Sequence, residues 1–306
     1  MASNDMIVAI AGGSGFIGAA IARRLAHAGH LVRILTRNPD RVRDRFDFPN
    51  VDLFRADVTD PSSLRIPLAG AHAIIDTVQF DGYPVENHRR GLTFERIDFG
   101  GTNALLDACD DQRIQRFIYV SGAAADAYSP HPGFRAKGNA ERSIRNSGLP
   151  FTIFRPSLVY GPGDRVLTMF ARILKLSPVF VMPGSGQQKL QPVLVNDLAQ
   201  CVELALGGRG LNGSFEIGGP DPLTFDALIK LMMEVTKRHR AVVHAPAALM
   251  NITGAIAESL PHPIFSRDAA TFVLADSLCD NSALLAEFGI TLTPASIGLR
   301  YLAEGS

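Results

Sequence analysis

Residues 6–18 read MIVAIAGGSGFIG and decide the fold of this 306-residue chain. The first six residues are apolar and partly β-branched, which predicts a short buried strand. Three glycines, Gly12, Gly15 and Gly18, follow at intervals of three residues. A helix is indicated next by apolar residues at every fourth position: Ile17, Ile21 and Leu25. We therefore predict a strand, a tight glycine turn and a helix.

The alternation of strand and helix continues through the first half of the chain. Further short apolar runs cover residues 31–35, 51–55, 73–77, 117–121 and 151–155. Gly29 stands where the first helix requires a left-handed residue at its C-terminal end. Repeated strand–helix–strand units predict an α/β fold with a doubly wound parallel sheet of Rossmann type. Ligands of such sheets bind beyond the carboxyl ends of the strands.

The pattern of apolar and turn-forming residues changes after Tyr160. Gly and Pro residues punctuate shorter segments there, as in Gly161-Pro162-Gly163. We predict a nucleotide-binding domain and a smaller C-terminal lobe for a substrate or partner. The predicted domain covers residues 1–158 with 192–218 returning to it, and the lobe covers 159–191 and 219–306. The apolar run at 246–260 is interpreted as core packing, with a partner surface or a shallow membrane contact as alternatives.

The glycine turn is suited to the pyrophosphate of a dinucleotide. Gly12 allows the tight turn, Gly15 lets the backbone approach the phosphates, and Gly18 lets helix and strand pack closely. The helix N-terminus then offers free N–H groups to an anion. The predicted contact residues are Gly12, Ser14, Gly15, Phe16, Ile17 and Gly18. The alternative is a glycine turn with a structural role only.

The end of the second strand distinguishes NAD from NADP. An acid at this place accepts a hydrogen bond from the ribose 2′-hydroxyl, whereas an arginine accommodates a 2′-phosphate. Thr36 and Arg37 stand here, and no acid comes before Asp40. The sequence therefore favours NADP(H) over NAD(H), with Arg41 as reinforcement. Alternatively, Arg37 is a solvated surface charge and either cofactor is accepted.

The end of the third strand offers a second contact with the nucleotide. Asp57, followed by Val58, stands at this position. Its carboxylate either holds the adenine amino group or starts a turn with Thr59.

Composition excludes several other classes of function. The chain has 30 Lys and Arg and 30 Asp and Glu, so no overall field holds nucleic acid or an anionic membrane, although a local basic patch is compatible with this balance. The three cysteines are widely spaced, which indicates reduced thiols, and we expect no metal site. No apolar run suits a transmembrane segment. We expect a cytoplasmic protein, either free or peripheral to a membrane complex.

Several motifs, in family order, resemble the extended short-chain dehydrogenase/reductases. They are Gly12–Gly18, Ala56-Asp57-Val58, Gly101-Thr102-Asn103, Tyr119-Val120-Ser121-Gly122, Lys137 and 155–162. In that family a serine orients the substrate carbonyl. A tyrosine four residues before a lysine acts as the general acid, and the lysine lowers the pKa of the tyrosine and holds ribose. The resemblance implies the corresponding roles for Ser121 and Lys137.

The tyrosine of that set is absent. Gly133 stands four residues before Lys137, and Phe134 beside it has no proton to donate. Tyr128 and His131 lie in the preceding loop and are the candidate substitutes.

Without the tyrosine, the two matching residues keep alternative roles. Lys137 either binds the ribose or forms a surface ion pair with Glu141, one helical turn on. Ser121 either binds substrate or caps the end of a strand. Asp98 is a further departure, because many relatives carry asparagine there.

The downstream half is similar to an atypical branch of this epimerase/dehydratase-like superfamily, related to the accessory NAD(P)H-binding subunit of respiratory complex I. The basic end of the second strand and the missing tyrosine belong to the same resemblance. Its short tail motifs cover residues 190–199, 215–220, 264–268 and 288–294. The resemblance implies a protein partner for the C-terminal lobe.

Residues 79–96 match no family pattern, although they follow the fourth strand and overhang the expected cofactor. Tyr83, Glu86 and His88 lie in this segment. Such a composition suits either a substrate lid or a solvated polar loop.

Whether the protein is an enzyme is open at this point. One hypothesis is an accessory or regulatory protein that holds NADP(H) as a ligand. The alternative is an NADPH-dependent oxidoreductase that reduces a small apolar carbonyl or quinone-like substrate with a substitute proton donor. A sugar-nucleotide epimerase or dehydratase ranks third, because such enzymes normally keep the tyrosine and an acid after the second strand.

Overall fold

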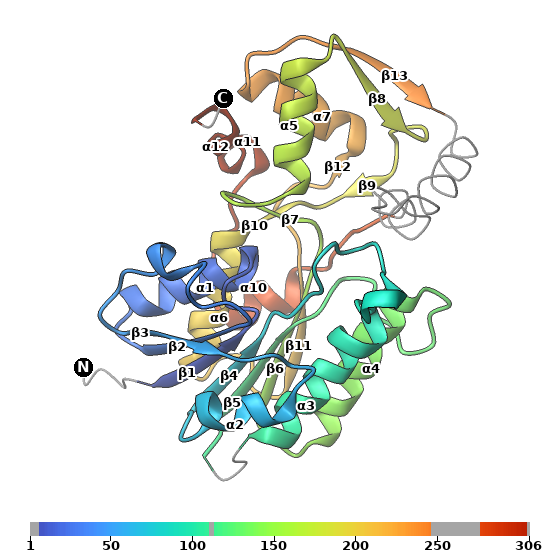
Figure 1. Cartoon of the computed structure of the whole chain (residues 1–306). Helices are drawn as coiled ribbons and strands as arrows, with labels where there is room; N and C mark the ends of the chain where they lie inside the picture. Colours follow the sequence, from blue (N-terminus) through green and yellow to red (C-terminus); the bar gives the residue numbers. More distant parts are fainter. Residues whose placement is uncertain (1–5, 110–112, 246–275, 305–306) are drawn as a thin grey trace.

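The computed structural model describes residues 6–109, 113–245 and 276–304. Its main sheet has seven parallel strands in the order β11-β6-β5-β4-β1-β2-β3 (Figure 1). The strands are β1 (Ile7–Ala11), β2 (Leu31–Thr36), β3 (Val51–Arg55), β4 (Ala73–Asp76), β5 (Arg116–Val120), β6 (Phe151–Pro156) and β11 (Gly213–Ile217). The six strands predicted in the first half are confirmed to within one residue at each end, and the Rossmann-type fold is confirmed with them.

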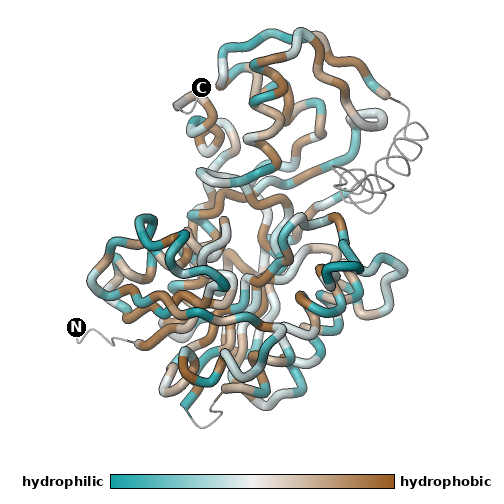
Figure 2. The backbone as a smooth tube through the Cα atoms, in the orientation of Figure 1, coloured by the Kyte–Doolittle hydropathy of each residue, from teal (hydrophilic) through white to brown (hydrophobic). Residues whose placement is uncertain are grey.

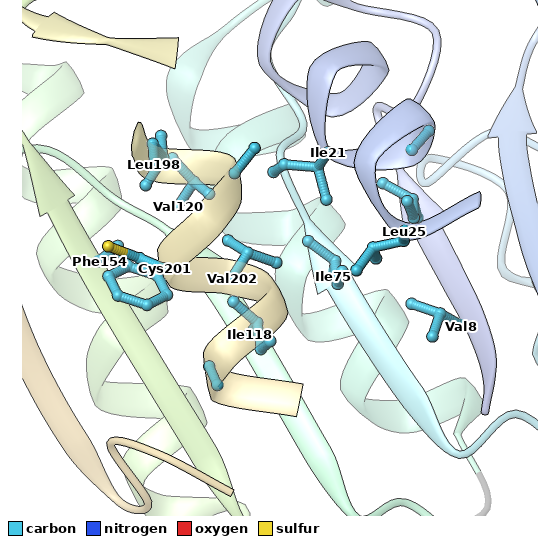
Figure 3. Packing of buried hydrophobic residues seen from close by; sticks show 14 of the residues in the cluster. Val8, Ile21, Leu25, Ile75, Ile118, Val120, Phe154, Leu198, Cys201 and Val202 are labelled. Atoms are coloured by element: carbon cyan, nitrogen blue, oxygen red, sulfur yellow. The ribbon is translucent and has the colours of Figure 1, made fainter. Parts of the chain in front are cut away.

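Helices α1 (Phe16–His27) and α6 (Val195–Leu206) cover one face of the sheet. Figure 3 shows Ile21 of α1 and Val202 of α6 directed toward the buried strand residues Ile75 and Ile118. Because successive strand residues point to opposite faces, Ile118 and Val120 belong to this layer and Phe117 to the other. Gly29 has φ of +92°, as predicted for the residue that ends the first helical segment.

Helices α2 (Arg65–Leu68), α3 (Gly100–Ala108) and α4 (Pro132–Asn146) cover the opposite face. Leu105 of α3 and Ile144 of α4 pack there against Phe117 and Ile74 of the strands. With apolar layers on both sides, the strands are near-continuous apolar runs, as expected of a parallel sheet.

A smaller lobe lies above the carboxyl ends of the strands in Figure 1 and has its own apolar core. Its helices are α5 (Val166–Leu176), α7 (Phe225–Val235), α11 (Ala295–Gly298) and α12 (Tyr301–Glu304). Its strand pairs are β8 (Val179–Pro183) with β13 (Ala241–Ala245) and β9 (Lys189–Leu190) with β12 (Leu223–Thr224). A further pair, β7 (Val159–Tyr160) with β10 (Val193–Leu194), lies where the chain passes between lobe and sheet.

Helix α10 (Ser282–Phe288) belongs to the core of the main sheet, although the sequence analysis placed residues 219–306 in the lobe. The ring of Phe288 lies 5.5 Å from that of Phe154 on β6 and 5.1 Å from that of Phe215 on β11. These ring contacts hold α10 against the main sheet. The apolar run at 246–260 and the motif at 264–268 lie outside the described residues. Within the described ranges, every helix is too short or too polar to cross a bilayer.

Candidate functional site

The glycine turn lies at the carboxyl end of β1, where the strand order changes direction. Gly12 has φ of +74°, and a Cβ atom on it would lie 2.7 Å from the carbonyl oxygen of Thr77. A Cβ atom on Gly18 would lie 2.7 Å from Cα of Gly13 and closer still to the Gly12 carbonyl oxygen. Glycine is therefore required at both positions.

The N-terminus of α1 is open to an anion. Its N-cap residue, Gly15, has no side chain that could cap it, and its first turn contains no acid. The first backbone hydrogen bond of the helix runs from the N–H of Ala19 to the carbonyl oxygen of Gly15 (3.0 Å). The N–H groups of Phe16, Ile17 and Gly18 therefore lack acceptors within the helix. Close backbone approach and unused donors together fit the pyrophosphate of a dinucleotide.

The predicted binding site for the 2′-phosphate, Thr36 and Arg37, lies at the end of β2. The Ser14 hydroxyl donates to Thr36 Oγ1 (3.1 Å), which ties the glycine turn to the end of this strand. Arg37 is exposed. Asp40, the nearest acid along the chain, lies 3.4 Å from Arg43 and 3.7 Å from Arg55. In the part of the chain that the structure describes, no carboxylate lies within 4.0 Å of the Arg37 guanidinium, so its charge is available.

After β3, Asp57 starts a turn with Thr59, which was one of its two predicted roles. Its carboxylate accepts hydrogen bonds from the N–H (2.9 Å) and the hydroxyl (2.8 Å) of Thr59. Val58 packs against Gly101 of α3, where a Cβ atom would lie 2.7 Å from the valine Cγ2. The adenine contact of Asp57 stays a prediction.

Ser121 is bound to a buried carboxylate, Glu141, which the sequence had suggested only as a surface partner of Lys137. Its hydroxyl donates to Glu141 Oε1 (2.7 Å). Arg155 donates to both oxygens of Glu141 (2.8 and 2.6 Å), and Arg145 donates to Oε2 (2.9 Å). Glu141 is fully buried, and its hydrogen bonds raise the pKa of Arg155. The one sequence signal was a charged Arg155 inside an apolar strand, which needs a buried partner.

Lys137 does not form the surface ion pair with Glu141 that was one alternative, and we correct that interpretation. Its side chain is 7% exposed, and Nζ lies 3.9 Å from Asp98 Oδ1. Glu141 faces Arg155 of β6, whereas Lys137 faces the π-helix η4 (Phe94–Phe99). The ammonium also lies 5.6 Å from the centre of the Tyr119 ring.

Asp98 and Asp76 place two buried carboxyl groups near the one ammonium of Lys137. Both Asp98 side-chain oxygens are buried and have no hydrogen-bond partner among the described residues. Burial raises the pKa of Asp98 to about 7, although Lys137 opposes this. Asp76 accepts from Thr102 Oγ1 (2.7 Å), and burial raises its pKa as well. Asp98 can therefore hold a proton near neutral pH.

The candidate substitutes for the tyrosine occupy different environments. The side chain of Tyr128 is 86% exposed. His131 is half-buried and meets the ring of Phe134 edge-on, with the ring centres 5.6 Å apart. Gly133 is buried in the first turn of α4. The proton-donor role of Tyr128 stays a prediction, and its exposure gives that role no support.

Part of the 79–96 segment is packed and part is solvated. Phe80, Tyr83 and Phe94 pack ring against ring, with their centres 5.0–5.7 Å apart. Glu86 accepts a hydrogen bond from the N–H of Phe94 (2.8 Å). Residues 88–90 are exposed. The aromatic half packs with Ala136 of α4, so the segment is anchored beside the Lys137 helix.

Comparison with known proteins agrees with this geometry. A family model described as NAD(P)H-binding matches residues 12–167. The chain is 28% identical to the mitochondrial NADH dehydrogenase [ubiquinone] 1 alpha subcomplex subunit 9 of Arabidopsis thaliana, over 92% of this chain and 73% of the relative. It is 27% identical to the mitochondrial NADH-ubiquinone oxidoreductase 40 kDa subunit of Neurospora crassa, over 89% of this chain and 72% of the relative.

A solved structure of similar fold is the UDP-glucose 4-epimerase of Thermotoga maritima. It has a TM-score of 0.77 and 21% identity, over 98% of each chain. At this identity the likeness concerns the fold alone. The family match, the glycine turn and the open helix N-terminus agree on a nicotinamide dinucleotide. The chain thus belongs to the NAD(P)H-binding family, and over most of its length it is similar to subunits of mitochondrial NADH dehydrogenases.

Proposed function

We propose that this protein binds NADP(H) in preference to NAD(H) and acts as a cofactor-binding accessory or regulatory protein. The N–H groups of the glycine turn and of α1 would hold the pyrophosphate, and Thr36 and Arg37 would hold the adenosine ribose. When bound, the cofactor can supply a hydride, and Lys137 can turn from Asp98 to hydrogen-bond the nicotinamide ribose. We assign residues 1–158 and 192–218, together with α10, to the nucleotide-binding unit, and the lobe contacts a protein partner or a small apolar substrate.

The preference for NADP(H) is supported by the charge of Arg37. Because Asp40 lies close to Arg43 and Arg55, Arg37 can give its hydrogen bonds to a 2′-phosphate. We expect Arg37→Ala to weaken NADPH binding about tenfold or more, since a hydrogen bond to a charged group contributes about 1.5–3 kcal/mol. NADH binding should change little. Arg65→Ala, on the exposed side of α2, is the control, and calorimetric titration with both cofactors is the measurement. Equal losses for NADPH and NADH would contradict the assignment.

The accessory role is supported above all by the hydrogen bond from Ser121 to Glu141. That bond commits the hydroxyl proton to a buried carboxylate instead of a substrate carbonyl. Gly133 lacks the phenol that would neutralise the oxygen of a reduced carbonyl. We therefore expect the protein to bind NADPH without oxidising it when quinones and aldehydes are added. Sustained NADPH oxidation, followed by absorbance, would refute this.

An oxidoreductase is the second candidate, and Asp98 favours it. Its carboxyl group, which has no hydrogen-bond partner among the described residues, can hold the proton that a reduced substrate takes up. If turnover is found, Asp98→Asn should abolish it while NADPH binding persists. Turnover unchanged by this substitution would leave Tyr128 and His131 as the donors to test.

A further inference from the structure

Helix α5 carries an apolar stripe that the described residues of the lobe leave exposed. Leu167 and Leu174 face the lobe core. Four other aliphatic side chains are 37–79% exposed: Val166, Met169, Ile173 and Leu176. Intervals of three, four and three residues place them on one side of the helix, away from the core-facing side. A helix in a soluble lobe needs only one apolar face, and α5 has two.

The neighbouring two-stranded sheet also exposes aliphatic side chains. Val181 of β8 and Val243 of β13 are paired across the strands, and both are more than half exposed. Phe180 and Met182 alternate with Val181 and point into the core. Phe180 packs edge-on against Phe170 of α5, with the ring centres 5.7 Å apart. Figure 2 shows apolar segments along α5 and along both strands of this pair.

The chain segments that contain α5, β8 and β13 carry an excess of positive charge. Residues 166–189 and 235–245 contain no Asp or Glu, in a chain that has 30 acidic and 30 basic residues overall. They contain six Lys and Arg, namely Arg172, Lys175, Lys189, Lys237, Arg238 and Arg240. Arg240 donates to the carbonyl oxygen of Leu174 (2.8 Å), which places the 235–245 segment beside the end of α5. In the described part of the chain, none of the six side-chain cationic groups lies within 4.0 Å of a carboxylate, although Asp276 accepts a hydrogen bond from the backbone N–H of Lys189 (2.7 Å).

We propose that this face of the lobe docks on an anionic lipid bilayer. The aliphatic side chains of α5 would enter the boundary between headgroups and acyl chains, while the flanking cations meet lipid phosphates. Side chains that protrude singly from a helix enter a bilayer without needing a shaped partner. A second copy of the chain fits less well, because two such basic faces repel each other.

Vesicle flotation of the full-length protein tests this proposal. We expect binding to vesicles of phosphatidylcholine mixed with phosphatidylglycerol, no binding to phosphatidylcholine alone, and release at high salt. Lys175→Glu should weaken binding at least about fivefold, since each basic residue contributes about a factor of five. Leu176→Ser should weaken it about tenfold, through loss of the most exposed aliphatic side chain of the stripe.

Arg65→Glu and Ile66→Ser are the matched controls. Both residues are exposed, but they lie on α2, a helix that covers the main sheet and not the lobe. They should bind vesicles like the parent. NADPH titration of every variant reports whether the nucleotide-binding fold is intact. Absence of binding to anionic vesicles, equal binding to neutral ones, or equal losses in the controls would overturn the proposal. A dimer that Leu176→Ser dissociates, detected by analytical ultracentrifugation, would instead assign the stripe to a second copy.

Discussion

Replacing Glu141 with glutamine tests the structural role assigned to Ser121. The Glu141 carboxylate accepts four hydrogen bonds of 2.6–2.9 Å, from Ser121, Arg145 and both donating nitrogens of Arg155. Glutamine keeps the shape of the side chain but removes its charge. It also turns one acceptor oxygen into an NH₂ group that faces other donors. Arg155, only 27% exposed in its side chain, then loses its counter-charge.

The cost follows from the burial of the two partners. Removing one member of a buried ion pair costs about 3–5 kcal/mol. Water reaches part of Arg155 and Arg145, so we expect the lower end, a loss of about 3 kcal/mol in the free energy of unfolding. Ser121→Ala removes one hydrogen bond to a charged acceptor and should cost about 1.5 kcal/mol.

Urea denaturation at neutral pH measures these losses. Arg145→Ala is the control, because it removes the more exposed partner of the same carboxylate and should cost about 0.5 kcal/mol. If Glu141→Gln costs no more than Arg145→Ala, the reasoning about a buried network is refuted. If Ser121→Ala leaves stability intact but stops an NADPH-dependent turnover, the hydroxyl is catalytic instead.

Three further substitutions test other parts of the site. Gly18→Ala should lower the free energy of unfolding by about 2–3 kcal/mol and weaken NADPH binding, because the new methyl group meets backbone atoms. Gly100→Ala is the control: its new Cβ atom would lie 3.4 Å from its nearest neighbour, so in a helix it should be neutral or stabilising. Urea denaturation measures both, and equal costs would contradict the prediction. The pKa of Asp98 rises from 3.8 to about 7 on folding, so between these pH values the folded state binds one more proton than the unfolded state. Stability therefore falls as the pH rises from 3.8 to about 7. Asp98→Asn should flatten that fall and raise stability above pH 7, and an unchanged slope of urea midpoints against pH would refute it. Tyr128→Phe should leave NADPH affinity unchanged in calorimetry because the ring is exposed, and a loss of affinity would place it in the site.

Local pattern was sufficient for the strands and for the glycine turn. Six apolar runs predicted six strands to within a residue, because a buried parallel strand requires a continuous apolar stretch. The φ of +74° at Gly12 was likewise encoded locally, since glycine tolerates this conformation and other residues rarely do. The motif at residues 12–18 therefore indicated the cofactor class before any tertiary contact was known.

Pairing between distant side chains was decided only by the tertiary structure. Sequence spacing suggested Lys137 with Glu141, four residues apart, yet Lys137 lies beside Asp98 and Glu141 binds Arg155. Charge and sequence spacing indicate which residues could form ion pairs. The packing of α4 between η4 and β6 decides which of these pairs actually form. Exposure of the α5 stripe has the same origin, because an apolar residue is covered only where another element packs on it, and that depends on the three-dimensional arrangement of the lobe.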